Sequence, residues 1–113
     1  MHELALTQGI LDIVSSEQKK QGFKDVKAIR LMVGEYSGIV PDYIKDFFPA
    51  VSKGTCAERA TLDISFVPAE IRCLDCGFEG RPGRRKAFCP QCGGTAFIMT
   101  KGREFYVENI LVE

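Results

Sequence analysis

A chain of 113 residues suits one domain that carries a small insertion, and it would bury about two-thirds of its unfolded surface. Hydrophobic residues make up 45% and charged residues 27% of the chain, and fifteen Lys and Arg balance fifteen Asp and Glu. This balance excludes a whole-molecule field that favours nucleic acid or anionic membrane, and no apolar run approaches the ~20 residues of a membrane-spanning helix.

The N-terminal segment is typical of a protein that is not secreted. It lacks the basic start, the uninterrupted apolar stretch and the small-residue cleavage site of a secretory signal. We therefore expect the cytoplasm, where thiols stay reduced and closely paired cysteines bind metal more often than they form disulfides.

The first third of the chain predicts a helix followed by a strand. Apolar residues recur at helical spacing near the N-terminus and Gly22 can stop the helix, so we predict an amphipathic helix over residues 3–20. Residues 26–33 are expected to form a strand. One face of that strand carries three apolar residues: Ile29, Leu31 and Val33.

A second helix is predicted to begin at Pro41, because proline suits the first helical position. Its apolar residues are Tyr43, Ile44, Phe47 and Phe48. Pro49 should kink or end this helix, since it cannot donate a hydrogen bond to the carbonyl four residues back.

Two further strands are predicted on either side of a segment with a different composition. Residues 61–67 alternate between polar and apolar, which predicts an inward face made of Leu62, Ile64 and Phe66. Residues 71–99 hold few aliphatic side chains and four paired cysteines, and the strand pattern returns in residues 104–112.

These elements predict an α+β fold with two helices packed on a three-stranded sheet and an inserted four-cysteine zinc ribbon. The expected domains are residues 1–69 plus 101–113, which form the α/β layer, and residues 70–100, which form the ribbon.

The ribbon cysteines form two Cys-X-X-Cys pairs: Cys73 with Cys76 and Cys89 with Cys92. Two residues between thiolates let one tight turn aim both sulfurs at one ion, and the glycine after each pair lets the backbone turn back. Two such knuckles form a closed tetrahedral site, which indicates structural zinc rather than catalysis. The alternatives are a pair of disulfides and a rubredoxin-like iron site, and zinc is favoured over both.

The chain begins Met1-His2-Glu3. A histidine at position two can offer a metal the α-amine, its own backbone amide nitrogen and its imidazole, and the amide of Glu3 can supply a fourth nitrogen. Such a nearly planar nitrogen set suits Ni(II) or Cu(II) and suits tetrahedral zinc poorly. On these residues alone, a disordered terminus without function stays the simpler interpretation.

The whole chain resembles the HypA/HybF hydrogenase nickel-incorporation proteins. The motifs that carry the resemblance are the MHEL start, VGEYSGIVPD, SKGT, TLDI, the CLDCG and CPQCG knuckles and the closing GREFYVENILVE. The resemblance implies a nickel metallochaperone for [NiFe]-hydrogenase maturation, with nickel bound by Met1, His2 and Glu3. It also implies zinc on the four paired cysteines, delivery of nickel to the hydrogenase large-subunit precursor and the GTPase HypB as working partner.

Two other features are interpreted as structural. Cys56 is expected to be a small buried hydrophobe rather than a reactive thiol or a ligand. The basic residues at the ribbon tip are expected to form a solvated loop, with a docking patch for an acidic partner as the alternative. They are Arg81, Arg84, Arg85 and Lys86.

The sequence predicts a protein that is not an enzyme, because it has one histidine and no pairing of a nucleophile with a base. The alternative function is a nucleic-acid-binding zinc ribbon that uses the basic tip with Phe78 or Phe88, and the balanced charge argues against it. A third is a structural subunit of an oxidoreductase, which would bind no nickel. Whether the chain is a monomer or a homodimer, which hydrogenase it serves and whether it supplies urease stay open.

Overall fold

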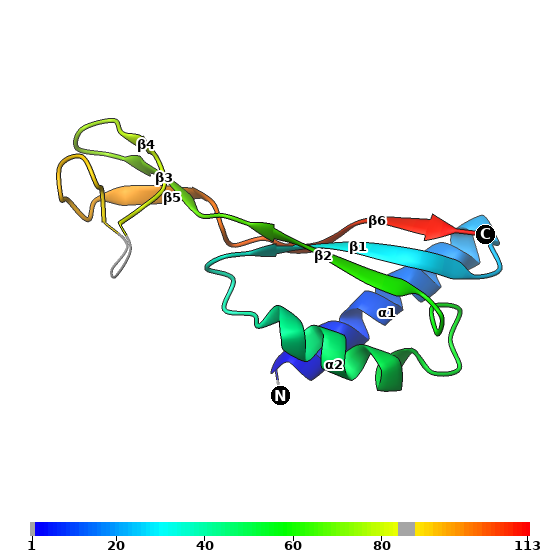
Figure 1. Ribbon diagram of the computed structural model, residues 1–113. Helices are drawn as coiled ribbons and strands as arrows, with labels where there is room; N and C mark the ends of the chain where they lie inside the picture. The colour runs from blue at the N-terminus through cyan, green and yellow to red at the C-terminus, as the bar shows by residue number, and fades with distance from the viewer. Residues whose placement is uncertain (1, 84–87) are drawn as a thin grey trace. The chain divides into compact units, whose positions relative to one another are not determined.

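The structure, a computed structural model, describes residues 2–83 and 88–113, and of His2 only the backbone. Its elements are α1 (His2–Gln21), β1 (Val26–Gly34), α2 (Pro41–Ser52), β2 (Thr61–Val67), β3 (Glu70–Cys73), β4 (Glu79–Gly80), β5 (Phe97–Lys101) and β6 (Phe105–Val112) (Figure 1). The predicted α+β class is confirmed, with two helices, a three-stranded sheet and a second small sheet that carries the cysteines. Within the described ranges, no helix is both long and apolar enough to span a bilayer.

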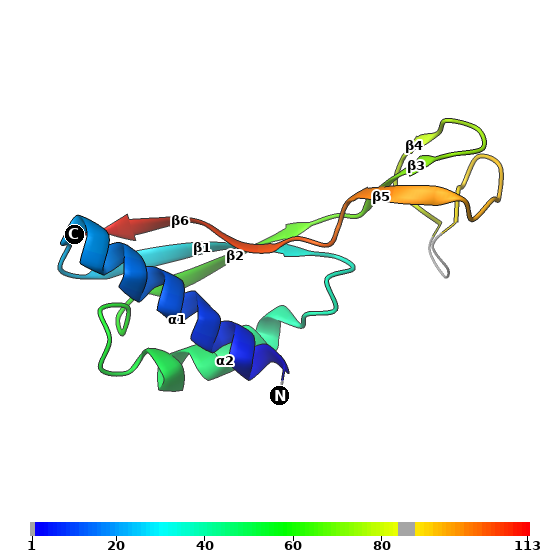
Figure 2. The ribbon, with the colours of Figure 1, turned by 180° about the vertical axis from the view of Figure 1, so that it is seen from behind.

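The first sheet has the strand order β2-β1-β6 and is mixed. The arrows of β1 and β2 run the same way and that of β6 runs against them (Figure 1). Parallel neighbours need a crossover connection, and α2 supplies it between β1 and β2. Both helices lie on one side of this sheet, as Figures 1 and 2 show.

The core lies between the helices and that sheet. The predicted inward residues Ile29, Leu31 and Val33 are all fully buried, so this prediction is confirmed. The helices contribute a matching apolar face whose buried members are Ile10, Leu11 and Val14 in α1 and Ile44 and Phe48 in α2. Because each strand side chain points to the opposite face from its neighbour, Arg30, which lies between Ile29 and Leu31, is exposed on the other side of the sheet.

The structure narrows one expectation about local structure and contradicts another. Pro49 was expected to kink or end the second helix, and the helix does not end there but continues to Ser52. Pro49 and Lys45 are both exposed, so the Lys45 carbonyl that loses its helical donor can be satisfied by water. Phe66 was expected to point inward, yet 59% of it is exposed near the end of an edge strand. Leu62 and Ile64 of the same strand are half-buried.

The chain forms two compact units. One comprises residues 1–32, 39–65 and 106–113, and the other comprises residues 33–38 and 66–105. The turn after β1 therefore belongs with the cysteine-bearing unit. Its backbone is bound there by Glu35, whose amide donates to the Val67 carbonyl at 2.9 Å, and by Tyr36, whose amide donates to the Gly102 carbonyl at 2.7 Å.

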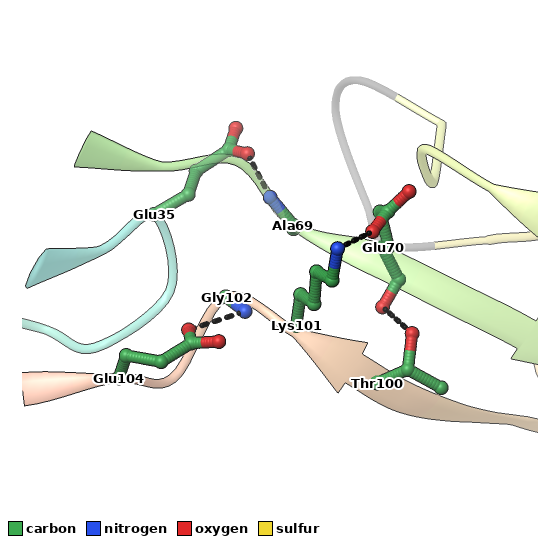
Figure 3. Close-up of polar contacts among 7 residues, drawn as sticks. All are labelled: Glu35, Ala69, Glu70, Thr100, Lys101, Gly102 and Glu104. Carbon is green, nitrogen blue, oxygen red and sulfur yellow. Dashed lines mark hydrogen bonds and ion pairs between the residues drawn. The ribbon is translucent and has the colours of Figure 1, made fainter. Parts of the chain in front are cut away.

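The side chain of Glu35 strengthens the same attachment. Its Oε1 accepts a hydrogen bond from the Ala69 amide at 2.8 Å, and its Oε2 pairs with Arg81 at 3.1 Å. These partners, the Ala69 amide first, hold the pKa of Glu35 below its ordinary value. Figure 3 shows the bond from the Ala69 amide to Glu35 beside three other contacts: from the Gly102 amide to Glu104, from Lys101 to the Glu70 carboxylate and from the Thr100 hydroxyl to the Glu70 carbonyl.

Gly34→Ala is expected to destabilise the fold by about 2–4 kcal/mol, because the backbone that connects β5 to β6 passes very close to the end of β1 at this point. A Cβ at Gly34 would contact the Gly102 carbonyl and lie 2.6 Å from the Glu104 amide nitrogen. These are main-chain atoms, which cannot rotate away as a flexible side chain could. Urea denaturation checks the difference in free energy of unfolding.

Gly9→Ala is the matched control, because nothing lies within 4 Å of a Cβ built on this helical glycine. It should stabilise the protein by roughly 0.5–1 kcal/mol through helix propensity. Equal stability of both variants would contradict the close approach of the backbone at Gly34.

Candidate metal centre

The first cysteine pair lies in a tight turn that follows β3. The Gly77 amide donates to the Cys73 carbonyl at 3.1 Å, and the Cys73 amide donates to the Phe78 carbonyl at 2.8 Å. Gly77 has a φ of +78°, which L side chains rarely adopt. This conformation lets the chain turn so that the Gly77 amide reaches the Cys73 carbonyl. In this turn the Cys76 sulfur lies within 4.8 Å of the Cys73 sulfur.

The second pair repeats this geometry at the same spacing. The Gly93 amide donates to the Cys89 carbonyl and the Cys89 amide donates to the Gly94 carbonyl, both at 2.8 Å. Gly93 has a φ of +76°. The two knuckles predicted from the Cys-X-X-Cys-Gly pattern are therefore both present in the folded chain.

The knuckles bring the four sulfurs into one cluster: Cys73, Cys76, Cys89 and Cys92 lie with all Sγ atoms within 4.8 Å of one another. Across the knuckles, Cys73 and Cys92 are 3.7 Å apart and Cys76 and Cys89 are 3.5 Å apart. A tetrahedron with zinc–sulfur bonds of ~2.3 Å has edges of about 3.8 Å, so these spacings fit such an ion. The first cysteine of each pair is buried and the second is exposed.

The electrostatics of the cluster favour a bound cation. Desolvation raises the pKa of Cys89, but hydrogen bonds from the backbone amides of Cys92 and Gln91 outweigh it and lower the pKa to about 7. At Cys76 the Phe78 amide lowers the pKa, but desolvation and hydrogen bonds with the neighbouring thiols raise it to about 12. Four thiolates this close repel one another, and a divalent cation removes that repulsion.

A small sheet supports the cluster. β3 lies between β4 and β5 and pairs antiparallel with both, and Ile71 of β3 is buried. Cys73 ends β3 opposite Phe97 of β5. The cluster has no open coordination position within its four sulfurs, so its chemistry is to hold an ion and fix the fold of the segment.

The N-terminal residues are described only in part. Met1 and the side chain of His2 lie outside the described residues, so the nickel ligands stay a prediction. Glu3 is buried, with 9% of its surface exposed. Its carbonyl accepts a hydrogen bond from Thr7 Oγ1 at 2.7 Å, and its Oε2 accepts a long hydrogen bond from the Val40 amide at 3.4 Å. The bond to Val40 links the beginning of α1 to the residue that precedes α2, whereas the bond from Thr7 lies within α1.

The other predicted residues have mixed outcomes. Cys56 is half-buried rather than buried, and it lines a shallow cavity of about 250 Å³ with Asp25 and Arg59. Partial burial raises the pKa of its thiol. Arg81 is paired with Glu35, an attachment that the sequence did not predict because the two residues are 46 positions apart. Arg84, Arg85 and Lys86 lie outside the described residues.

Comparisons with known proteins cover the whole chain. The family model described as hydrogenase/urease nickel incorporation, metallochaperone, HypA matches residues 1–112. A hydrogenase maturation factor HypA from Caldanaerobacter subterraneus subsp. tengcongensis is 37% identical over 114 residues, covering 100% of both chains. Another from Dehalococcoides mccartyi is 35% identical and covers 100% of this chain and 95% of the relative.

Two solved structures have the same fold. A solution structure of a HypA protein matches with a TM-score of 0.75 at 22% identity, covering 100% of this chain and 97% of that one. The solution structure of the Ni metallochaperone HypA from Helicobacter pylori matches with a TM-score of 0.70 at 20% identity, covering 97% and 96%.

Proposed function

We propose that this chain, which belongs to the HypA family of hydrogenase and urease nickel-incorporation metallochaperones, carries Ni(II) and delivers it to the large-subunit precursor of a [NiFe]-hydrogenase. The observation that carries this proposal is the family match over residues 1–112, together with hydrogenase maturation factors at 37% and 35% identity over the full chain. The family is not catalytic, so nickel is the cargo of the chain and takes part in no reaction on it.

The proposed nickel site is the N-terminus. Met1 would supply the α-amine, His2 its amide and imidazole nitrogens, and Glu3 its amide nitrogen. Two features support this set. α1 begins at His2, so the amides of His2 and Glu3 lie in a first helical turn, where no carbonyl four residues back competes for them. The Glu3 carboxylate accepts a hydrogen bond from the Val40 amide, so its oxygens are less available to a nickel ion than the Glu3 backbone nitrogen is.

The proposed ion at the four cysteines is structural zinc. The S···S spacing, the buried first sulfur of each knuckle and the all-thiolate set suit zinc, and closed four-thiolate sites are typical of structural ions. We assign nickel binding to residues 1–69 plus 101–113 and zinc binding to residues 70–100. The ion would supply much of the folding free energy of the ribbon, which is too small for a core of its own.

The proposed partners are the GTPase HypB and the hydrogenase precursor, in the cytoplasm. Nucleic-acid binding through the ribbon tip is not favoured. The exposed guanidinium of Arg81 is already paired with Glu35 at 3.1 Å, and the chain has no net charge. Binding to phosphates would have to compete with that ion pair.

Extending the N-terminus by defined numbers of residues tests this proposal. One Gly before Met1 would place the histidine third, so that amine, two amides and imidazole surround Ni(II) without Glu3. We expect this variant to bind nickel at least as tightly as the native chain and to release it more slowly. An extension of several residues should cripple binding, because the amine is then out of reach.

The measurements are nickel affinity by titration of untagged protein and the rate of transfer to a chelator or to hydrogenase precursor. Zinc content serves as the control, since both extensions lie far in sequence from the cysteines. Equal affinity and equal transfer for all three proteins would show that the α-amine is not a ligand.

A further inference from the structure

We propose that Thr7 is a positioning residue for nickel, whose buried hydroxyl fixes the Glu3 end of the N-terminal chelate and so slows the release of the ion. The hydroxyl donates to the Glu3 carbonyl at 2.7 Å, and both residues lie in α1. The inference rests on the proposed N-terminal nickel site and assigns to it a residue that binds no metal itself.

The core face of α1 changes from apolar to polar near its N-terminus. Its buried residues recur at helical spacing: Glu3, Thr7, Ile10, Leu11 and Val14. The last three are apolar, whereas the two nearest the proposed nickel site are polar. The described ranges contain one other buried polar residue, Ser52. Burial of a polar group costs free energy unless it is hydrogen-bonded, so packing alone does not explain this polar pair.

Both polar side chains of this pair hold residue 3 in place. The Thr7 hydroxyl holds its carbonyl, and the Glu3 carboxylate accepts the long bond from the Val40 amide at 3.4 Å. The Ser52 hydroxyl, by contrast, has no hydrogen-bond partner among the described residues. Residue 3 is therefore fixed through its main chain by Thr7 and through its side chain by the segment that precedes α2.

The peptide unit that Thr7 holds directly follows the proposed ligand nitrogens. Nickel would bind the amide nitrogens of His2 and Glu3 in place of their protons, so the chain before the Glu3 Cα must turn around the ion. The chain after that atom stays helical. The Thr7 hydroxyl holds the first peptide unit of the helical part, so the rearrangement is limited to residues 1–3. A backbone that is already ordered lowers the entropy that binding must remove.

The hydroxyl adds what the helix alone does not supply. Helix ends fray, because the amides of the first turn have no carbonyl four residues back. In an α-helix the Glu3 carbonyl accepts the Thr7 amide, and the hydroxyl is a second donor from the same residue. Thr7 is fully buried, and its β-branched side chain has few rotamers, so water does not compete and the hydroxyl stays directed at this carbonyl.

Thr7→Val tests the proposal, because it keeps the branched shape of the side chain and removes the hydroxyl. We expect nickel affinity to fall ~3–10-fold and transfer of nickel to a chelator to become faster by a similar factor. Thr7→Ser, which retains the hydroxyl, should restore the affinity to within ~2-fold of the native value. The measurements are nickel titration and stopped-flow transfer, with untagged, zinc-loaded, full-length protein.

Urea denaturation separates positioning from a structural role. In Thr7→Val the Glu3 carbonyl keeps its helical amide partner, so no polar group is left unpaired and stability should be unchanged or higher. Val14→Thr is the matched control, since it places a buried hydroxyl on the same face two turns further along α1. It should lower the free energy of unfolding and leave nickel affinity unchanged.

His2→Ala, measured in parallel, distinguishes failure of this inference from failure of the proposed site. If His2→Ala loses nickel and Thr7→Val binds it as tightly as the native chain, the role of Thr7 is overturned and the site stands. If His2→Ala keeps nickel, the site and the inference both fail. A loss in Thr7→Val that Thr7→Ser does not restore, or an equal loss in Val14→Thr, would assign the effect to packing and overturn the role of the hydroxyl.

Discussion

His2→Ala is expected to abolish stoichiometric nickel binding, with a loss of affinity of at least ~100-fold. His2 is the only histidine of the chain, so no other imidazole can replace it. The variant should keep one zinc per chain, because the zinc ligands are four cysteines that lie in another compact unit. The measurements are nickel titration of untagged protein and metal content by mass spectrometry.

Gln8→Ala is a suitable control, since Gln8 is an exposed residue of the same helix and offers no imidazole. It should bind nickel like the native chain. Nickel bound at unaltered affinity by His2→Ala would place the site elsewhere and would remove the N-terminal chelate from the mechanism.

Cys89→Ala is expected to reduce zinc from one ion per chain to nearly none and to unfold the cysteine-bearing segment. Cys89 is fully buried and accepts a hydrogen bond from the Cys92 amide at 3.5 Å, so it anchors the second knuckle. Zinc binding of a four-thiolate site contributes on the order of 10 kcal/mol to folding, far more than this small segment can supply otherwise. Zinc content and amide hydrogen exchange check the result.

The helices and the β2-β1-β6 sheet should survive the same substitution. Their core includes Ile10, Ile29 and Leu31, which are buried without any contribution from zinc. Amides of α1 and β1 should therefore stay protected while those of β3 and β5 exchange. Cys56→Ala is the matched control and should retain zinc, since Cys56 lies outside the cluster. Free titration of the four cluster thiols by a thiol reagent in the native protein would contradict a bound ion.

Most secondary structure follows from local sequence. The helix predicted over residues 3–20 is His2–Gln21, and the strand predicted over residues 61–67 is Thr61–Val67. The buried face of β1 was also predicted, because alternation at period two assigns Ile29, Leu31 and Val33 to one side whatever the rest of the fold. The exposed position of Phe66 could not be inferred in this way, since alternation assigns a face but does not show whether another element covers it.

The cysteine cluster was predictable for the same local reason. Each Cys-X-X-Cys-Gly segment contains the residues that form its own turn. Gly77 and Gly93 both adopt the positive φ that this turn needs. The meeting of the two knuckles follows once a single ion is assumed, because four thiolates from two turns complete one tetrahedral site.

Only the tertiary structure decided which distant segments the turn after β1 contacts. Glu35 accepts the Ala69 amide and pairs with Arg81, and a side chain at Gly34 would collide with the backbone of Gly102 and Glu104. These partners are 34 to 70 positions away in the sequence, where no periodicity or spacing rule connects them. The sequence by itself therefore determined the helices, the strands and the metal-binding knuckles, which depend on near neighbours. The attachment of residues 33–38 to the cysteine-bearing unit depends on distant segments that meet only when the chain has folded.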